Sequence, residues 1–437
     1  MNKYDLIVIG SGAAGMCAAI KAGRDGKKVL LLEKLSKLGA KLKATGGGRC
    51  NLTNTLCNED FMAKFGRNGR FMRDALTLLD HNALITFFKE IGVQTHAPDG
   101  FRVFPVGHSS QTILTALEDE LTRLHVNVLT SQKVTELLSD GKLLSGVKTE
   151  TETFYAPNII IATGGLGYPT LGAEGDGYTL ASLLGHTTTE LFPAMMPLST
   201  KESWTDNCRA DTIAKVELRV DIKKYNKLKA KGDLIFTKNG IRGPVVLDFA
   251  REITPLLSQL GEVPIIANLT KGMNEDEMLR RFKNETIKNP DASIEESLLG
   301  ILPSSVISEL CKLVGAESSM KFAKLEGKQR SELLKILIST PLTVTGHDGF
   351  KMAMITRGGI SLKEISPQTM QSKIVKGLYF CGEVMDIDGP CGGYNLQWSF
   401  ASGYLAGCLL WNLTNIQGKD MNNWLRAYIV ARWIWII

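Results

Sequence analysis

The stretch "LIVIGSGAAGMCAAIKAGRDGKKVLLLEK", residues 6–34, constrains the fold more than any other part of the chain. It has the pattern of an apolar strand, a glycine-rich turn, a helix and a second strand. Gly10, Gly12 and Gly15 have G-x-G-x-x-G spacing, and Glu33 closes the second strand. The glycine spacing alone is weak evidence, but the strand, the helix and the acid agree with it. The stretch therefore predicts a dinucleotide-binding unit of the Rossmann type.

Each position in this unit has an expected role. Gly10 permits the tight turn, Gly12 lets the backbone approach a pyrophosphate, and Gly15 allows the helix to pack closely on the strand. The N-terminus of that helix then faces the phosphates. Glu33 is expected to accept hydrogen bonds from an adenosine ribose. The predicted cofactor contacts of this unit are Gly10, Gly12, Ala13, Ala14, Gly15, Glu33 and Lys34.

The next segment, "KLGAKLKATGGGRCNLTN" at 37–54, favours FAD over NAD as the cofactor. An NAD domain would normally continue into another βα unit here. This loop instead collects bare amides and cations that are suited to wrap an extended diphosphate ligand. Glycine triplets also occur in flexible loops, which is the alternative interpretation. The predicted contacts here are Lys41, Gly47, Gly48, Arg49, Cys50 and Asn51.

A second strand-then-glycine signature lies in "APNIIIATGGLGYPTLGAEGDGY", residues 156–178. The apolar strand ends at Thr163 and Gly164, at the carboxyl edge of the sheet, where ligands of doubly wound folds bind. Asp176 is expected to cap the following helix. The alternating runs before this strand, residues 126–155, predict a β-meander. Val134, within those runs, is also a predicted cofactor contact.

The third signature is "KGLYFCGEVMDIDGPCGGYNLQWSFASGYLAG" at 376–407, which reads as a strand, a polar loop, a diglycine turn and a small-residue helix. A helix N-terminus carries partial positive charge, and a reduced flavin carries negative charge around N1 and O2. The bare glycines would let the ring approach those amides, so the helix is expected to position and tune the flavin. The predicted contacts are Gly382, Glu383, Asp386, Gly392, Gly393, Tyr394, Asn395 and Leu396. This interpretation requires that both ends of the chain fold around one FAD.

These motifs, together with "FTKNGIRGP" and "TRGGISLKEISPQTM", resemble a family of bacterial flavoproteins. That family includes aminoacetone oxidase and the bile-acid-inducible FAD/NAD(P) oxidoreductases, and the resemblance extends over residues 3 to about 410. It implies an FAD held by a Rossmann-like domain that is made from both chain ends. It also implies an insertion with a β-barrel-like part and a helical part.

The periodicity of the middle of the chain independently predicts such an insertion. Strand-like alternation such as "AKVELRVDIK" gives way to helical periods such as "NEDEMLRRFKNETIK". The predicted fold class is α/β, with a Rossmann-like FAD-binding domain and an inserted β-barrel-like plus helical lobe. The predicted parts are residues 1–190 and 366–415 for the FAD-binding domain, 191–271 and 341–365 for the β-rich domain, 272–340 for the helical subdomain and 416–437 for a C-terminal tail.

Composition limits the partners that we expect. The net charge of +6 is a mild excess, so no nucleic acid is expected as a partner. The eight scattered cysteines predict a cytoplasmic protein, and the six histidines lack metal-ligand spacing. No membrane span is expected, because no apolar run reaches about 18 residues. The aromatic tail at 422–437 is predicted to be a docking helix rather than a membrane anchor.

The leading functional hypothesis is an FAD-dependent oxidoreductase that transfers a hydride between a small organic substrate and flavin N5. The substrate would be an amine, a ketone or an enone. No second nucleotide fingerprint follows the first, so either NAD(P)H binds transiently or oxygen is the other electron partner. No catalytic acid or base is assigned. Three alternatives are a thiol/disulfide enzyme using Cys50 and Cys57, a flavin-dependent RNA-modifying enzyme, and a respiratory dehydrogenase that touches a membrane through its tail.

Overall fold

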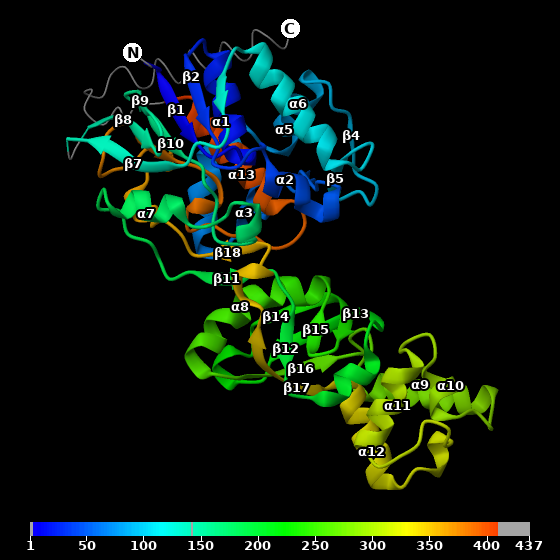
Figure 1. The fold of residues 1–437 in the computed structure, drawn as a ribbon. Coiled ribbons are helices and arrows are strands. Elements are labelled where there is room, and N and C mark those ends of the chain that lie inside the picture. The colour runs from blue at the N-terminus through cyan, green and yellow to red at the C-terminus, as the bar shows by residue number, and fades with distance from the viewer. Residues whose placement is uncertain (1–2, 141–142, 410–437) are drawn as a thin grey trace.

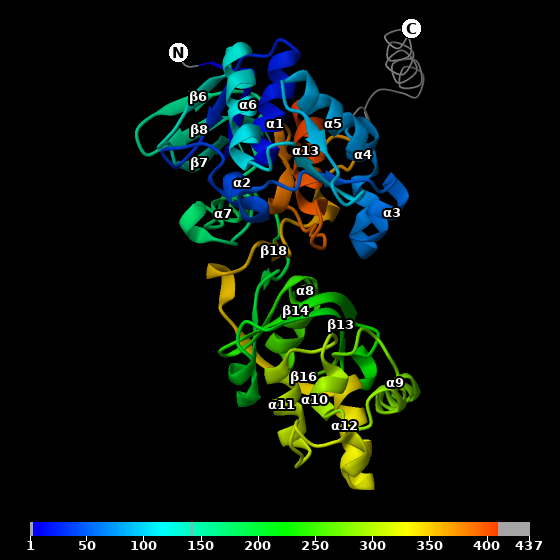
Figure 2. The same cartoon turned by 90° about the vertical axis from the view of Figure 1, so that its right-hand side faces the viewer.

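A computed structural model describes residues 3–140 and 143–409. The described chain forms a nucleotide-binding part and an inserted lobe (Figure 1). The two are joined where β11 (Phe192–Ala194) pairs antiparallel with β18 (Ile355–Arg357). The view turned by 90° shows the same separation into two bodies (Figure 2).

The nucleotide-binding part is built on a five-stranded sheet with the order β19-β10-β1-β2-β6. All its strand pairs are parallel, and the central strand β1 is wholly buried. Such runs are apolar throughout because both faces of a parallel sheet are covered. Strands from both ends of the chain therefore share one sheet, as predicted. The strand bounds are β1 Leu6–Ile9, β2 Val29–Leu32, β6 Asn127–Leu129, β10 Ile159–Ile161 and β19 Leu378–Phe380.

Helices α1 (Ala13–Arg24) and α13 (Tyr394–Gly407) pack against each other at very short range. A Cβ atom built on Gly403 would lie 2.2 Å from the Ala14 carbonyl oxygen, and one on Gly407 would lie 2.4 Å from the Ala18 oxygen. Both glycines are therefore required by backbone contact between the two helices. This contact explains the small-residue composition of the late helix.

Further helices and two small sheets complete this part. The helices are α2 Ala40–Ala44, α3 Asn58–Ala63, α4 Arg73–Leu78, α5 His81–Glu90, α6 Ser110–Arg123 and α7 Asp176–Ser182. One small sheet contains β3 Thr53–Asn54, β4 Thr95–His96 and β5 Arg102–Pro105. The other contains β7 Val134–Ser139, β8 Leu144–Thr149 and β9 Thr153–Tyr155.

The second small sheet is an antiparallel meander, which confirms that part of the sequence interpretation. The first run of the predicted meander behaves differently. It forms β6, which joins the central sheet in parallel with β2. The alternation of residues 126–155 therefore covers two sheets, and local pattern alone does not separate them.

The inserted lobe is a closed six-stranded barrel with the order β12-β15-β14-β13-β16-β17. Side chains alternate along β13, so that Val216, Leu218 and Val220 point into the core. Helix α8 (Pro244–Leu260) adds an apolar face to the same core. The strand bounds are β12 Leu198–Thr200, β13 Thr212–Val220, β14 Lys229–Thr237, β15 Gly240–Arg242, β16 Val263–Asn268 and β17 Thr340–His347.

A group of helices is inserted between β16 and β17 and extends from the far end of the barrel (Figure 1). Its apolar residues belong to the same core cluster as the barrel. Helices α9, α10 and α12 begin with a capping box, in which the side chains of the cap residue and of the third helical residue each accept a hydrogen bond from the other's backbone N–H. The bounds are α9 Glu275–Lys288, α10 Ile294–Leu298, α11 Ser304–Leu313 and α12 Gly327–Ile338.

Candidate functional site

The glycine turn after β1 contains two glycines that the fold requires and one that faces open space. Gly10 has φ +100, and a Cβ there would lie 2.7 Å from the Ala162 oxygen. A Cβ on Gly15 would lie only 1.9 Å from the Gly10 oxygen. A Cβ on Gly12 would meet no protein atom within 4 Å, and Gly12 lines a pocket. This open approach at Gly12 is what a bound diphosphate needs.

Glu33 fixes this turn through its carboxylate. Its Oε2 accepts hydrogen bonds from the Ser11 backbone N–H at 3.0 Å and from the Ser11 hydroxyl at 2.5 Å. Its Oε1 accepts from the Leu35 N–H at 2.9 Å. The acid therefore has a structural task beside its expected contact with a ribose. Its lone pairs are not exhausted by these bonds, because a carboxylate has about four acceptor sites.

The pocket runs along the carboxyl edge of the central sheet and reaches the start of β18. It is lined from both ends of the chain, by residues after β1 and β2 and by residues after β19. Among the predicted contacts, those that line it are Gly10, Gly12, Ala13, Ala14, Glu33, Lys34, Lys41, Val134, Thr163, Gly164, Gly382, Glu383, Asn395 and Leu396.

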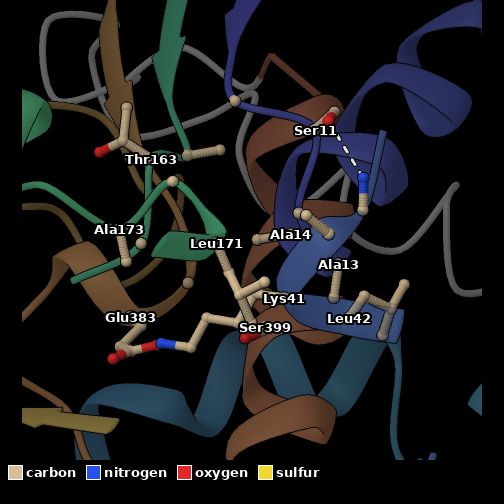
Figure 3. A pocket seen from close by; sticks show the side chains of 18 of the residues that line it. Ser11, Ala13, Ala14, Lys41, Leu42, Thr163, Leu171, Ala173, Glu383 and Ser399 are labelled. Atoms are coloured by element: carbon tan, nitrogen blue, oxygen red, sulfur yellow. Dashed lines mark hydrogen bonds and ion pairs between the residues drawn. The ribbon is translucent and has the colours of Figure 1, made fainter. Parts of the chain in front are cut away.

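Lys41 and Glu383 point toward each other across this pocket (Figure 3). The Lys41 Nζ lies 2.8 Å from Glu383 Oε2, although the two residues are far apart in sequence. The other oxygen, Oε1, accepts from the Thr356 backbone N–H at 2.8 Å. One carboxylate thus connects α2, the segment after β19 and strand β18. This arrangement places a cation and an anion beside the glycine turn, where a polar cofactor linker would pass.

A second set of charged side chains lies at the end of the pocket near β7. Lys34 pairs with Glu174 at 2.7 Å and with Asp176 at 2.5 Å, and Lys133 pairs with Asp176 at 3.2 Å. The expected capping role of Asp176 is wrong, because the helix cap is Gly175 and Asp176 is the first helical residue. The carboxylate is instead occupied by the two lysines. Lys133 was missed by the sequence interpretation, since it follows no motif.

Several predicted contacts lie outside the lining of this pocket. They are Gly15, Gly47, Gly48, Arg49, Cys50, Asn51, Asp386, Gly392, Gly393 and Tyr394. Gly47 and Gly48 have φ values of +66 and +85, and a Cβ on either would meet nothing within 4 Å. These two glycines therefore face open space, but they do not border the described cavity, which their loop reaches only at Thr45. Its role in cofactor binding stays a prediction.

The diglycine turn has a packing function that the sequence did not reveal. A Cβ on Gly393 would lie 2.5 Å from the backbone carbonyl of Thr53, and Gly393 has φ +85. With its amide oriented so that both atoms are satisfied, Asn51 accepts from the Gly393 N–H at 3.0 Å. The Asn54 amide donates to the Gly392 oxygen at 2.9 Å. These contacts hold the N-terminus of α13 against β3, and Asn395 and Leu396 follow directly in the pocket.

Two further predicted contacts have partners within the protein. Tyr394 packs against Phe61 and Phe65, and burial raises its pKa to about 12. The Asp386 carboxyl also has a raised pKa, mainly because of burial. Its backbone oxygen accepts from the Asn68 amide at 2.7 Å. Both residues therefore support the loop that leads to α13.

The inserted lobe contacts this loop through α8. Arg251 Nε lies 2.6 Å from Asp388 Oδ2, and its Nη2 donates to the Asp388 backbone oxygen at 2.9 Å. The Asp248 carboxylate accepts from the Cys391 N–H at 2.6 Å. Arg357 of β18 pairs with Glu252 of the same helix at 2.9 Å. One face of α8 thus holds the segment that contains the diglycine turn.

The two cysteines of the thiol alternative differ in their surroundings. Cys50 is buried, and burial raises the pKa of its thiol to about 12, which suppresses the reactive thiolate. Cys57 is exposed, and its thiol donates to the Asp60 carboxylate at 3.3 Å. Both are free in the structure. Because Cys50 is buried, this pair lacks the two accessible thiols that disulfide exchange requires.

We therefore expect Cys57→Ser to leave flavin reduction unchanged, because the exposed thiol has no activated partner. The measurement is the anaerobic rate of flavin bleaching by a nicotinamide, compared between parent and variant. Cys391→Ser, at the other exposed cysteine, serves as the matched control. A loss of reduction in Cys57→Ser alone would restore the thiol hypothesis.

Residues 3–140 and 143–409 contain neither a membrane-spanning helix nor a metal-binding cluster. No helix there is both long enough and apolar enough to cross a bilayer. Within the same ranges no group of three His, Cys, Asp or Glu side chains is arranged to hold a metal ion. The tail at 422–437 lies outside the described residues, so its predicted docking role stays a prediction.

Comparison with known proteins agrees with this geometry. The family model described as "HI0933-like protein Rossmann domain" matches residues 4–409. The chain belongs to the HI0933-like family. Within it, the 3-dehydro-bile acid delta(4,6)-reductase of Clostridium scindens is 33% identical over 93% of this chain and 98% of that protein. The ribosomal RNA dihydrouridine synthase of Escherichia coli is 30% identical over 92% of this chain and 97% of that protein.

A solved structure shows the same fold at low sequence identity. The 3-ketosteroid delta1-dehydrogenase of Sterolibacterium denitrificans superposes with a TM-score of 0.52 at 13% identity, over 94% of this chain and 99% of that one. By its family and its named reductase relative, the HI0933-like chain is an FAD-dependent oxidoreductase, and its structure has a Rossmann fold and a barrel lobe. The predicted family, fold class and enzyme class are confirmed.

Proposed function

We propose that this HI0933-like protein is a flavin-dependent reductase of carbon–carbon double bonds conjugated to a carbonyl group. Two relatives that match over nearly their whole length support this narrowing. One is named as a reductase of the Δ4,6 unsaturation of a 3-dehydro bile acid, the other as a synthase of dihydrouridine. Both names describe addition of hydrogen to a double bond conjugated to a carbonyl. Of the amine, ketone and enone substrates predicted from the sequence, only the enone contains a double bond of this kind.

The main support for FAD as the cofactor is that residues from both ends of the chain line one and the same pocket. The open face of Gly12 suits a diphosphate, and Glu33 and Val134 suit the adenosine end. Met354, Ile355 and Leu396 line the same pocket where the lobes join. We infer that the flavin ring lies at this second end. When bound, the flavin supplies hydride transfer at its N5 atom.

The protein's own residues would then bind the cofactor and orient it. Lys41 lines the same pocket as the glycine turn, so we infer that it exchanges Glu383 for a cofactor phosphate when the cofactor binds. The N-terminus of α13 brings partial positive charge toward the ring end. The α8 contacts hold the loop before the diglycine turn in place at the lobe junction. No acid or base is assigned, because no titratable group is tied to the substrate.

The electron partner is testable without knowing the natural substrate. We expect NADH or NADPH to bleach the flavin anaerobically, and a cyclic enone to restore the oxidised spectrum. The matched saturated ketone should leave the flavin reduced, because it lacks the acceptor double bond. Stopped-flow absorbance of the holoprotein measures both steps. Rapid reoxidation by oxygen with no response to any enone would instead indicate an oxidase.

A further inference from the structure

The basic residues of this chain are unevenly distributed over the inserted lobe. The segment 212–233, which forms β13, the connection to β14 and the first part of β14, contains seven Lys or Arg residues and three Asp or Glu residues. The helical insertion at 272–340 contains ten basic and eleven acidic residues. The net charge of the whole chain is only +6. We call the segment 212–233 the basic hairpin.

The strand register brings like charges together on the outer face of the basic hairpin. Arg219 pairs directly with Lys229, and the adjacent outward pair is Glu217 with Lys231. Arg219, Lys229 and Lys231 are exposed and line one shallow hollow on the barrel. Like charges directly opposite each other destabilise a sheet. The arrangement costs stability and creates a positive surface that can bind an anion.

Carboxylates of the protein neutralise only part of this surface. Glu217 pairs with Lys231 at 2.6 Å, and Arg219 lies 3.4 Å from Asp221. Exposed ion pairs of this kind are screened by solvent and contribute little to stability. Five exposed lysines of the hairpin form no ion pair with any carboxylate among the residues that the structure describes; they are Lys215, Lys223, Lys224, Lys227 and Lys229. The positive charge therefore faces solvent along the whole hairpin.

The composition of the face indicates which anionic partner it fits. None of the described large apolar side chains that are exposed lies between 212 and 233. A membrane surface site usually adds apolar anchors to its cations, and a protein interface usually centres on aromatic or aliphatic residues. Contacts to a phosphate backbone need only cations and polar groups. A nucleic acid therefore fits this face better than a bilayer or an acidic protein.

We propose that the outer face of the basic hairpin binds the phosphate backbone of RNA. The choice of RNA over DNA rests on the proposed function: uracil contains a double bond conjugated to a carbonyl, and RNA presents unpaired bases in loops. The binding surface itself rests on the charges alone. It replaces the expectation from net charge that no nucleic acid binds, because the mean charge of the chain conceals a local excess.

The test compares two triple variants of the holoprotein that lose the same charge. Arg219→Gln/Lys227→Gln/Lys229→Gln removes three cations from the basic hairpin. Lys283→Gln/Lys324→Gln/Lys328→Gln removes three exposed lysines from the helical insertion and is the matched control. The probe is an RNA hairpin with a uridine-rich loop, and binding is measured by fluorescence anisotropy over a series of salt concentrations. The slope of log K against log salt is negative, and each lost phosphate contact should reduce its magnitude by about 0.7 to 0.9.

We expect the hairpin variant to bind RNA at least about tenfold more weakly, with a slope whose magnitude is smaller by about 2 to 3. The control should match the parent in both affinity and slope. Equal affinity and slope in both variants would overturn the proposal. Tighter binding of DNA of the same sequence would overturn the choice of RNA. Preferential binding to phosphatidylserine vesicles, lost in the hairpin variant, would assign a membrane instead. Flavin reduction by NAD(P)H is measured separately, so a failure of the proposed reaction does not mimic a failure of binding.

Discussion

We expect Gly12→Val to fold normally and to bind FAD at least about 10- to 100-fold more weakly than the parent. The position has φ −70 and ψ −176, which any residue adopts, and a Cβ there meets no protein atom within 4 Å. The valine side chain would instead enter the pocket beside the glycine turn. It would displace the diphosphate from the helix N-terminus. Hydrogen bonds to charged groups are worth about 1.5–3 kcal/mol each, so losing one or two gives this loss of affinity.

A neighbouring glycine separates cofactor binding from folding. Gly15→Ala places a Cβ 1.9 Å from the Gly10 oxygen, so the helix must shift away from the strand. We expect this variant to lose thermal stability even without FAD, whereas Gly12→Val keeps the melting temperature of the apoprotein. Flavin fluorescence titration and circular dichroism of both apoproteins give the two readouts. FAD affinity equal to the parent in Gly12→Val would show that the diphosphate binds elsewhere.

Local sequence was sufficient for the cofactor half of the fold. Gly10 and Gly15 are fixed by contacts to residues that the turn itself brings near, and the strand at 159–161 ends beside them. The pairing of the two chain ends was also predictable, because both ends contain strand-then-glycine signals that belong to one sheet edge. The family resemblance added the barrel lobe. Its closure into six strands agrees with that expectation.

Contacts that depend on tertiary structure were not predictable from local pattern. Asp176 has the position of a cap in sequence, yet its carboxylate is occupied by Lys34 and Lys133 from another element. Gly393 was predicted to lack a side chain so that a flavin could approach it. In the structure, the absence of a side chain at Gly393 allows close contact with the Thr53 backbone. In both cases the partner is distant in the chain. Residue type alone indicates that a contact exists at such a position, but it does not identify the residue on the other side of the contact.

The α8 contact to the loop before the diglycine turn is of this kind, and it leads to the second large effect. Asp388→Arg should destabilise the fold and weaken FAD binding, because it leaves Arg251 facing another cation. The Arg251 and Asp388 side chains are each only 11% exposed. Breaking such a pair costs about 3–5 kcal/mol, whereas an exposed pair contributes about 0–1 kcal/mol. The loop leads directly to Asn395 and Leu396 in the pocket, so its displacement also reaches the cofactor.

The reciprocal exchange distinguishes an ion pair from simple packing. Arg251→Asp combined with Asp388→Arg should recover part of the lost melting temperature and part of the FAD affinity. Recovery stays partial because the arginine also donates to the Asp388 backbone oxygen, which the exchange does not restore. Lys288→Met, which breaks an exposed pair with Glu285 in the helical insertion, is the control and should change neither readout. If the double variant were as impaired as the sum of its single variants, the two charges would not be coupled, and the loop would have to be held mainly by the Asp248 contact to Cys391.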